Sequence, residues 1–155
     1  MTANNEQIGG DHYKIRGYQP WDFFLDANLG SGLVASAIEY TARWRQKNGI
    51  EDLKKARHFC KKLSENESRI NVDINQEALD NFAIQFYKED AQIIKLVYEG
   101  YYLCAMCDID ELIKKTEELA PAVNHAMVET GIDEQYKHVV MQMIGAGYAL
   151  TETPA

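Results

Sequence analysis

SGLVASAIEYTARWRQKNGIEDLKKARHFCKKLSE, residues 31–65, is the stretch that decides the fold. Its apolar residues recur at three- and four-residue intervals, which is the spacing of an amphipathic helix. Ser31 is a residue type that favours a helix N-cap, and Gly49 is a natural stop at a helix end. The spacing predicts one helix over residues 33–47 and a second over 51–65. Because Gly49 permits a sharp turn, we expect an antiparallel hairpin.

Outside the hairpin the sequence also predicts helices, and strand signals are nearly absent. The expected elements are an extended arm over residues 1–18, a short helix from Pro20 to Leu25 or Asn28, a polar connection over 66–75, one long amphipathic helix over 76–104, a helix from Asp108 towards Glu129 that Pro121 can bend and Gly131 closes, and a last helix over 133–149. We therefore predict an all-α protein: a helical hairpin with an N-terminal arm, followed by about three amphipathic helices.

The chain divides into two functional parts. Residues 1–66 hold the arm and the hairpin, which carries the candidate site, and residues 67–155 form a helical C-terminal extension. The apolar stripes of the extension either cover the hairpin within one compact unit or pair with other subunits. The sequence leaves both arrangements open, and we expect an oligomer.

Composition limits the class of protein. A chain of 155 residues with 46% hydrophobic and 26% charged residues can bury a core of its own. No apolar run approaches the roughly 20 residues that a membrane span needs. Residues 1–7 are polar and lack the apolar centre of a secretion signal. We therefore expect a cytoplasmic protein that does not engage a membrane.

Charge is unevenly distributed along the chain. Between Glu39 and Lys62 eight Lys or Arg oppose three acids, so this segment carries +5 and the remainder −13, within a total of −8. Binding to a duplex requires a broad cationic surface, which this balance does not supply. A small basic island in an acidic body suits a compact anion better than a long nucleic acid.

The three cysteines fit a reducing compartment, because an odd number makes a poor disulfide framework. Cys104 and Cys107 have the spacing of a redox or metal-binding pair, but no second pair accompanies them and they follow an apolar helical run. We expect ordinary buried or half-buried thiols, with redox or zinc chemistry as the alternative.

The first helix of the hairpin presents polar groups on one face. Glu39, Arg43 and Lys47 follow at four-residue intervals, Tyr40 lies three residues before Arg43, and Ser36 adds a hydroxyl one turn before Tyr40. Arg offers a planar fork for phosphate oxygens, and Lys offers a point charge. Three aromatic residues can stack on a base, namely Tyr40, Trp21 and Trp44.

The second helix adds groups at its start. Asp52 and Lys55 lie near its N-terminus, where the helix dipole and free N–H groups attract anions. An antiparallel hairpin brings the end of one helix to the start of the next, so Arg43, Lys47 and Lys55 can converge on one phosphate group. Glu39 and Asp52 are polar partners in this arrangement. No residue is assigned to catalysis or to a metal.

Other interpretations of the same residues stay open. Glu39–Arg43 and Glu51–Lys55 are stabilising i,i+4 pairs, so the face can also be ordinary solvated helix surface. A metal-dependent all-α pyrophosphohydrolase needs clustered carboxylates on facing helices, and Glu39 with Glu51 and Asp52 supplies only a sparse form of that set. His12, in the glycine-flanked arm, either folds back over the hairpin to touch a ligand or only caps a helix.

Five short motifs in the first part of the chain also carry a family resemblance. They are His12-Tyr13, Gln19-Pro20-Trp21-Asp22, Ala37-Ile38-Glu39-Tyr40-Thr41-Ala42-Arg43, Lys47-Asn48-Gly49 and Glu51-Asp52-Leu53-Lys54-Lys55-Ala56. As a set they resemble the small phage-encoded SaV-like family, whose members are often labelled "nucleotide kinase". The likeness covers about residues 10–63, and each motif alone is weakly specific.

The resemblance implies a phage protein that binds nucleotides inside an infected bacterial cell. The family includes a nucleoside-monophosphate kinase that lacks a Walker loop and forms a large oligomer, which implies phosphoryl transfer from ATP, with Mg²⁺, and a homo-oligomer. The residues that fall on pattern positions are His12, Tyr13, Tyr40, Arg43, Lys47, Asp52 and Lys55. Glu39 stands where the pattern has Lys, and Ala35-Ser36 where it has Gly-Asn. Losing a cation and gaining a carboxylate should weaken polyphosphate binding.

Three hypotheses follow. In the first, the chain is a nucleoside-monophosphate kinase-like protein whose Arg43, Lys47 and Lys55 hold phosphate, while Tyr40 and Tyr13 contact sugar or base and His12 orients the ligand. In the second, it is a non-catalytic oligomer that sequesters cyclic or ADP-ribose-type immune-signalling nucleotides and needs no cofactor. In the third, it is a structural or partner-binding helical protein whose basic face is solvated.

Overall fold

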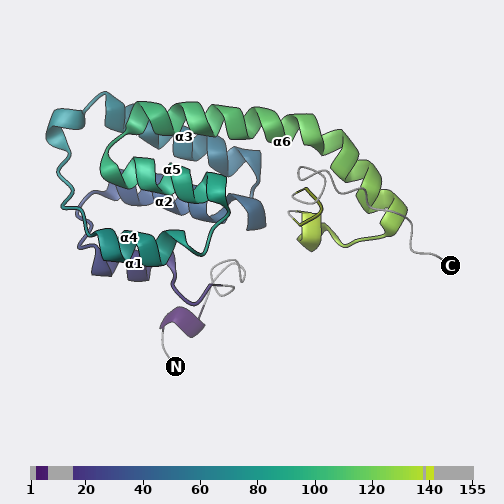
Figure 1. Ribbon diagram of the computed structural model, residues 1–155, viewed down its shortest axis with the longest axis horizontal. Coiled ribbons are helices and arrows are strands. Elements are labelled where there is room, and N and C mark those ends of the chain that lie inside the picture. Colours follow the sequence, from purple (N-terminus) through teal and green to yellow (C-terminus); the bar gives the residue numbers. More distant parts are fainter. Residues whose placement is uncertain (1–2, 7–15, 138, 142–155) are drawn as a thin grey trace. The chain divides into compact units, whose positions relative to one another are not determined.

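The fold of the described residues is built from helices alone. The computed structural model describes residues 3–6, 16–137 and 139–141. Its α-helices are α1 (Pro20–Asp26), α2 (Gly32–Arg43), α3 (Ile50–Ser64), α4 (Gln76–Ala83), α5 (Lys88–Glu99) and α6 (Tyr102–Thr130) (Figure 1). Short 3-10 turns lie at Ala3–Asn5, Trp44–Gln46, Glu67–Arg69 and Glu134–Tyr136. The predicted all-α class is therefore confirmed for this part of the chain.

The hairpin of α2 and α3 forms where the sequence predicts it. The Ser31 hydroxyl caps α2 by accepting a hydrogen bond from the Val34 N–H at 3.4 Å. α2 ends at Arg43, earlier than the predicted residue 47, and the chain tightens into the 3-10 turn Trp44–Gln46. Gly49 then has a φ of +57°, which few other residues tolerate, and its N–H donates to the Trp44 carbonyl at 2.8 Å. This turn reverses the chain into α3.

The single long helix predicted over residues 76–104 is wrong, because the chain forms α4, α5 and the start of α6 there. Gly100 ends α5 in the left-handed region, with a φ of +90°, and the Tyr101 N–H closes onto the Leu96 carbonyl at 2.8 Å. α4 packs against α1, whereas α5 packs against α2, so their apolar stripes serve different partners. The helix start predicted at Asp108 is also wrong, since that residue lies inside α6.

Aromatic rings form the centre of the contact between α1, α4 and α5. The Phe23 and Phe82 rings stack with their centroids 4.7 Å apart, and Tyr98 meets Phe23 edge-on at 5.1 Å. The Tyr98 hydroxyl accepts a hydrogen bond from the Asn75 N–H at 2.9 Å and donates one to the Asp73 carbonyl at 3.0 Å. Each ring is fully buried, and together they fix α4 and α5 against α1.

The chain forms two compact units, one up to Asp110 and one from Glu111. The first holds the hairpin together with α1, α4 and α5, so these helices share a unit with the hairpin, whereas the predicted functional division lies at residue 66. In the second unit, the later part of α6 contributes to a small apolar cluster. Its buried members are Val123, Met127 and Val140.

The end of α6 is where the sequence predicts it. The helix continues through Pro121 and stops at Thr130, and Gly131 follows with a φ of +65°. Of the last predicted helix, over residues 133–149, the described part is the 3-10 turn Glu134–Tyr136 and helical residues 137 and 139–141. The remainder of that prediction lies outside the described residues.

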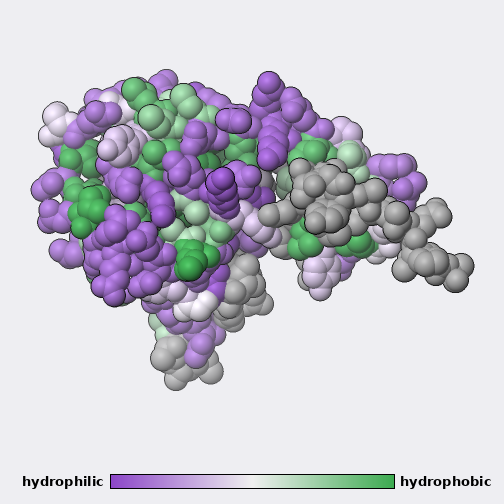
Figure 2. Space-filling model, in the orientation of Figure 1, coloured by the Kyte–Doolittle hydropathy of each residue, from purple (hydrophilic) through white to green (hydrophobic). Residues whose placement is uncertain are grey.

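The surface is mainly hydrophilic on the face that Figure 2 shows, with hydrophobic residues in separate small areas. Large exposed apolar side chains include Leu25 of α1, Ile84 after α4 and Leu103 of α6. Across residues 3–6, 16–137 and 139–141, no helix is both long and apolar enough to cross a membrane.

All three cysteines are free thiols. Cys60 is buried in α3, and burial raises the pKa of its thiol to about 12. Cys104 and Cys107 are exposed on α6, rather than buried or half-buried as the apolar run before them suggests.

Candidate functional site: the Asp52 cluster of the hairpin

Asp52 is the centre of the candidate site. It lies in the first turn of α3, where the helix dipole stabilises a negative charge, and it is fully buried. One carboxylate oxygen accepts a hydrogen bond from Arg43 Nε at 3.0 Å, and the other accepts one from Asn48 Nδ2 at 3.0 Å. Lys55 Nζ approaches the second oxygen at 3.9 Å. This carboxylate therefore ties the end of α2, the turn and the start of α3 together.

Tyr40 is the aromatic surface of the cluster. The Arg43 guanidinium carbon lies 4.4 Å from the centre of the Tyr40 ring, and Lys55 Nζ lies 5.7 Å from it. Phe59 of α3 stacks on the same ring, with centroids 5.7 Å apart and an angle of 18° between the planes. Two cations from two helices thus gather around one phenol ring that is itself backed by a second ring.

Two further carboxylates sit on the outer side of the cluster. Glu39 Oε1 contacts Arg43 Nη1 at 3.3 Å, and Glu51 Oε1 contacts Lys55 Nζ at 2.6 Å. The hydrogen bond from Lys55 to Glu51 raises the pKa of Lys55. The side chains of Glu39 and Glu51 are 40% and 67% exposed, so water reaches both ion pairs and weakens them. An anion on this side of the cluster would compete with these carboxylates for the two cations.

The other predicted site residues differ in how they relate to this cluster. Lys47 is exposed in the turn, and no ion pair joins it to the cluster within the described ranges. Ser36 is half-buried on α2, one turn before Tyr40. Trp21 is 44% exposed on α1, and no ring contact links it to Tyr40 in the part of the chain described. His12 and Tyr13 lie outside the described residues.

Arg45, two residues after Arg43, is the centre of a second cluster, which the sequence analysis does not predict. Arg45 donates two hydrogen bonds to the buried carboxylate of Asp90, from Nε at 2.6 Å and from Nη2 at 3.0 Å. The Trp44 indole N–H donates to the same carboxylate at 3.0 Å. The Arg45 guanidinium also lies against the rings of Trp44 and Tyr87, at 4.4 Å and 4.5 Å.

This second cluster is a structural connection between the hairpin turn and α5. Trp44 is only 1% exposed, so its expected role as a stacking surface for a base is wrong. The sequence offered one sign of this cluster, namely an acid, Asp90, in the first turn of a helix. Its pairing with Arg45 could not be predicted, because the two residues are 45 positions apart and local spacing does not relate them.

Among the described residues, no group of three or more His, Cys, Asp or Glu side chains is arranged to hold a metal ion. Glu39, which is partly exposed beside Tyr40 and Arg43, is a carboxylate of the cluster that a metal ion entering from solvent would reach.

Comparison with known proteins finds one similarity. Residues 9–61 match a family described as a protein of unknown function (DUF3310), which is about a third of the chain. The matched segment contains every residue predicted for the ligand site, and it excludes Asp90. No curated protein and no solved structure matches the chain.

Proposed function

We propose that this chain is a phage nucleotide-binding protein, and that the Asp52 cluster binds the phosphate-bearing part of its ligand. One observation carries the proposal: Arg43 and Lys55, from two helices, share both the buried Asp52 carboxylate and the Tyr40 ring. Asp52 holds Arg43 in a fixed orientation, which lowers the entropy cost of binding an anion. Tyr40 offers a ring edge or face to a sugar or a base.

In the binding step, the phosphate displaces Glu39 from Arg43. The Glu39 carboxylate contacts Arg43 Nη1 in the way that a phosphate oxygen would, and it is partly exposed. Lys55 and the exposed Lys47 then add charge from the start of α3 and from the turn. Asp52 keeps its bond to Arg43 Nε throughout, because that carboxylate is fully buried.

The first form of this proposal is a nucleoside-monophosphate kinase-like activity that uses ATP. Mg²⁺ would enter with the ATP phosphates, with Glu39 as a candidate ligand, and would neutralise charge on the transferring phosphoryl group. Arg43, Lys47 and Lys55 would stabilise the same charge. The resemblance to the SaV-like family supports this form.

The second form is a non-catalytic sponge for cyclic or ADP-ribose-type signalling nucleotides. The contact between Glu39 and Arg43 favours it, because a carboxylate beside the guanidinium repels a triphosphate more than a ligand of low charge. In this form the protein needs a snug site and returns its ligand unchanged.

A homo-oligomer is part of both forms, as the family resemblance implies. Trp21 and Leu25 lie four residues apart on α1 and are 44% and 79% exposed, which supplies an apolar contact that association would bury. Sedimentation velocity across a range of protein concentrations tests this directly, and a monomer at all concentrations would contradict it.

One experiment separates the forms. The protein is incubated with Mg²⁺, ATP, the nucleoside monophosphates and a panel of cyclic nucleotides, and bound and free fractions are identified by mass spectrometry. New diphosphates support the kinase. One intact nucleotide on the protein, with no product, supports the sponge.

The matched variants are Arg43→Ala and Lys61→Ala, which remove one positive charge each. Lys61 is exposed near the end of α3 and belongs to the basic island but not to the cluster. We expect Arg43→Ala to lose binding or turnover and Lys61→Ala to retain it. Absence of any bound or converted nucleotide would leave a structural or partner-binding protein with a solvated basic face.

A further inference from the structure

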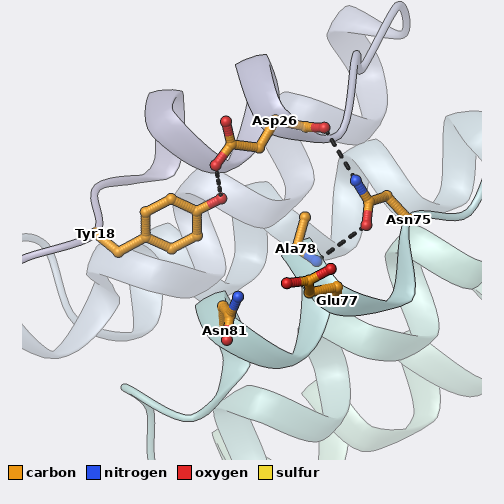
Figure 3. A pocket seen from close by; sticks show the side chains of 6 residues that line it. All are labelled: Tyr18, Asp26, Asn75, Glu77, Ala78 and Asn81. Atoms are coloured by element: carbon orange, nitrogen blue, oxygen red, sulfur yellow. Dashed lines mark hydrogen bonds between the residues drawn. The ribbon is translucent and has the colours of Figure 1, made fainter.

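A pocket of about 390 Å³ lies between α1 and α4, and it shares no residue with the Asp52 cluster. Figure 3 shows the Asp26 and Glu77 carboxylates at opposite walls, with the Tyr18 ring at a third side. The full lining is Tyr18, Asp26, Asn75, Glu77, Ala78 and Asn81. Its walls come from two helices and the segments that precede them.

Hydrogen bonds hold these walls in place. The Tyr18 hydroxyl donates to Asp26 Oδ2 at 2.6 Å, and partial burial together with this bond raises the pKa of Tyr18, so the phenol keeps its proton. Asn75 Nδ2 donates to the Asp26 carbonyl at 3.1 Å, while Asn75 Oδ1 accepts from the Ala78 N–H at 3.1 Å. The walls made by Tyr18, Asp26 and Asn75 are therefore in place before any ligand enters, and the exposed side chains of Glu77 and Asn81 complete the lining from α4.

The lining has the chemistry of a cation site. It contains two carboxylates, an aromatic ring and two carboxamide side chains, and no Lys, Arg or His. Its volume falls within the range of pockets for small organic molecules, roughly 300–1,000 Å³. A hard metal ion needs about six close oxygen ligands, whereas these two carboxylates stand on separate walls.

We propose that this pocket binds a small organic dication of the alkyl diamine class. One ammonium group pairs with Asp26 beside the Tyr18 ring, and the other pairs with Glu77 across the space. The carboxamide oxygens of Asn75 and Asn81 accept the remaining N–H bonds. This site is independent of the nucleotide site.

Isothermal titration at low salt tests the proposal with 1,4-diaminobutane, and with butylamine and 1,4-butanediol as the one-charge and uncharged analogues. The diamine should bind with one-to-one stoichiometry, butylamine about tenfold more weakly, and the diol not at all. Glu77→Gln and Asp26→Asn should each weaken diamine binding by about tenfold. An unchanged unfolding midpoint of Glu77→Gln, an exposed position, shows that the fold is kept.

Glu118→Gln is the matched control, because it removes the same charge from an exposed position of α6. Equal weakening by Glu118→Gln would mean general attraction to a chain of net charge −8, and would overturn the proposal. Displacement of the diamine by stoichiometric Mg²⁺, or the absence of saturable heat, would also overturn it. The Arg43→Ala variant should bind the diamine as the unsubstituted protein does. The diamine proposal can therefore fail or hold independently of the nucleotide proposal.

Discussion

Arg43 and Arg45 are two residues apart, and each pairs with a buried carboxylate and an aromatic ring, yet their surroundings differ. Arg45 directs two nitrogens at one carboxylate and lies against two rings, Trp44 and Tyr87. Arg43 pairs with buried Asp52 and also with partly exposed Glu39, and its neighbour Lys55 is itself 40% exposed.

This difference separates a structural ion pair from a candidate binding group. A bidentate pair enclosed by two rings leaves a ligand no group to replace, whereas the Glu39 carboxylate on Arg43 is 40% exposed, so a ligand in solution can compete with it. Arg45 connects the hairpin to α5, and Arg43 connects the two helices of the hairpin while facing groups that solvent reaches.

The largest expected effect is on the unfolding free energy, when the structural pair of Arg45 and Asp90 is broken. Asp90→Ala leaves Arg45 and the Trp44 N–H buried without their acceptor, so we expect a loss of about 3–5 kcal/mol in unfolding free energy. Urea unfolding measures it. Asp80→Ala, which removes an exposed acid paired with Lys95, should cost about 0.5 kcal/mol. Similar losses of unfolding free energy in the two variants would contradict the assignment of Arg45 to a structural ion pair.

Arg43→Ala should have the next largest effect on stability and the largest on the ligand. Asp52 keeps Asn48 and Lys55 as partners, so the loss of unfolding free energy should be roughly 1–3 kcal/mol. Affinity for the bound nucleotide should fall by about 10- to 100-fold. A folded Arg43→Ala protein that binds nucleotide normally would remove Arg43 from the site.

Glu39→Lys tests whether Glu39 selects against ligands with a highly charged phosphate group. The substitution restores the cation of the family pattern at a partly exposed position, so the unfolding free energy should change by about 0.5 kcal/mol. Affinity for ATP should rise by about tenfold at low salt, and affinity for a monophosphate should rise less. Equal gains for both nucleotides would show that Glu39 does not act on phosphate charge.

Lys47→Ala should have the smallest effect. The residue is exposed, so the change in unfolding free energy should stay within about 0.5 kcal/mol. We expect the nucleotide affinity to fall about threefold, and the difference to disappear at high salt. A loss as large as that of Arg43→Ala would mean that the turn, and not the Tyr40 side, holds the phosphate.

Much of the hairpin could be predicted from its sequence, because its signals are local. Ser31 caps α2, Gly49 supplies the turn, and the residues between them repeat at helical spacing. The meeting of Arg43, Asp52 and Lys55 follows from the hairpin alone. The convergence of Arg43, Lys47 and Lys55 on phosphate stays a prediction.

What the sequence could not reveal depends on distant partners. The apolar pattern of residues 76–104 continues across two breaks, and only packing against α1 and α2 separates α4 from α5. Gly100 was a usable local signal for the second break. The Arg45–Asp90 pair and the pocket between α1 and α4 join residues that lie far apart in the chain.

The most direct test of the account follows the side-chain Nε–H signals of Arg43 and Arg45 by nuclear magnetic resonance. Both protons are held by carboxylates, at 3.0 Å and 2.6 Å between heavy atoms, so both should be observable. Titration with the nucleotide that the protein captures should shift the Arg43 signal saturably and leave the Arg45 signal in place. Unchanged signals for both, or equal shifts of both, would contradict a nucleotide site at the Asp52 cluster.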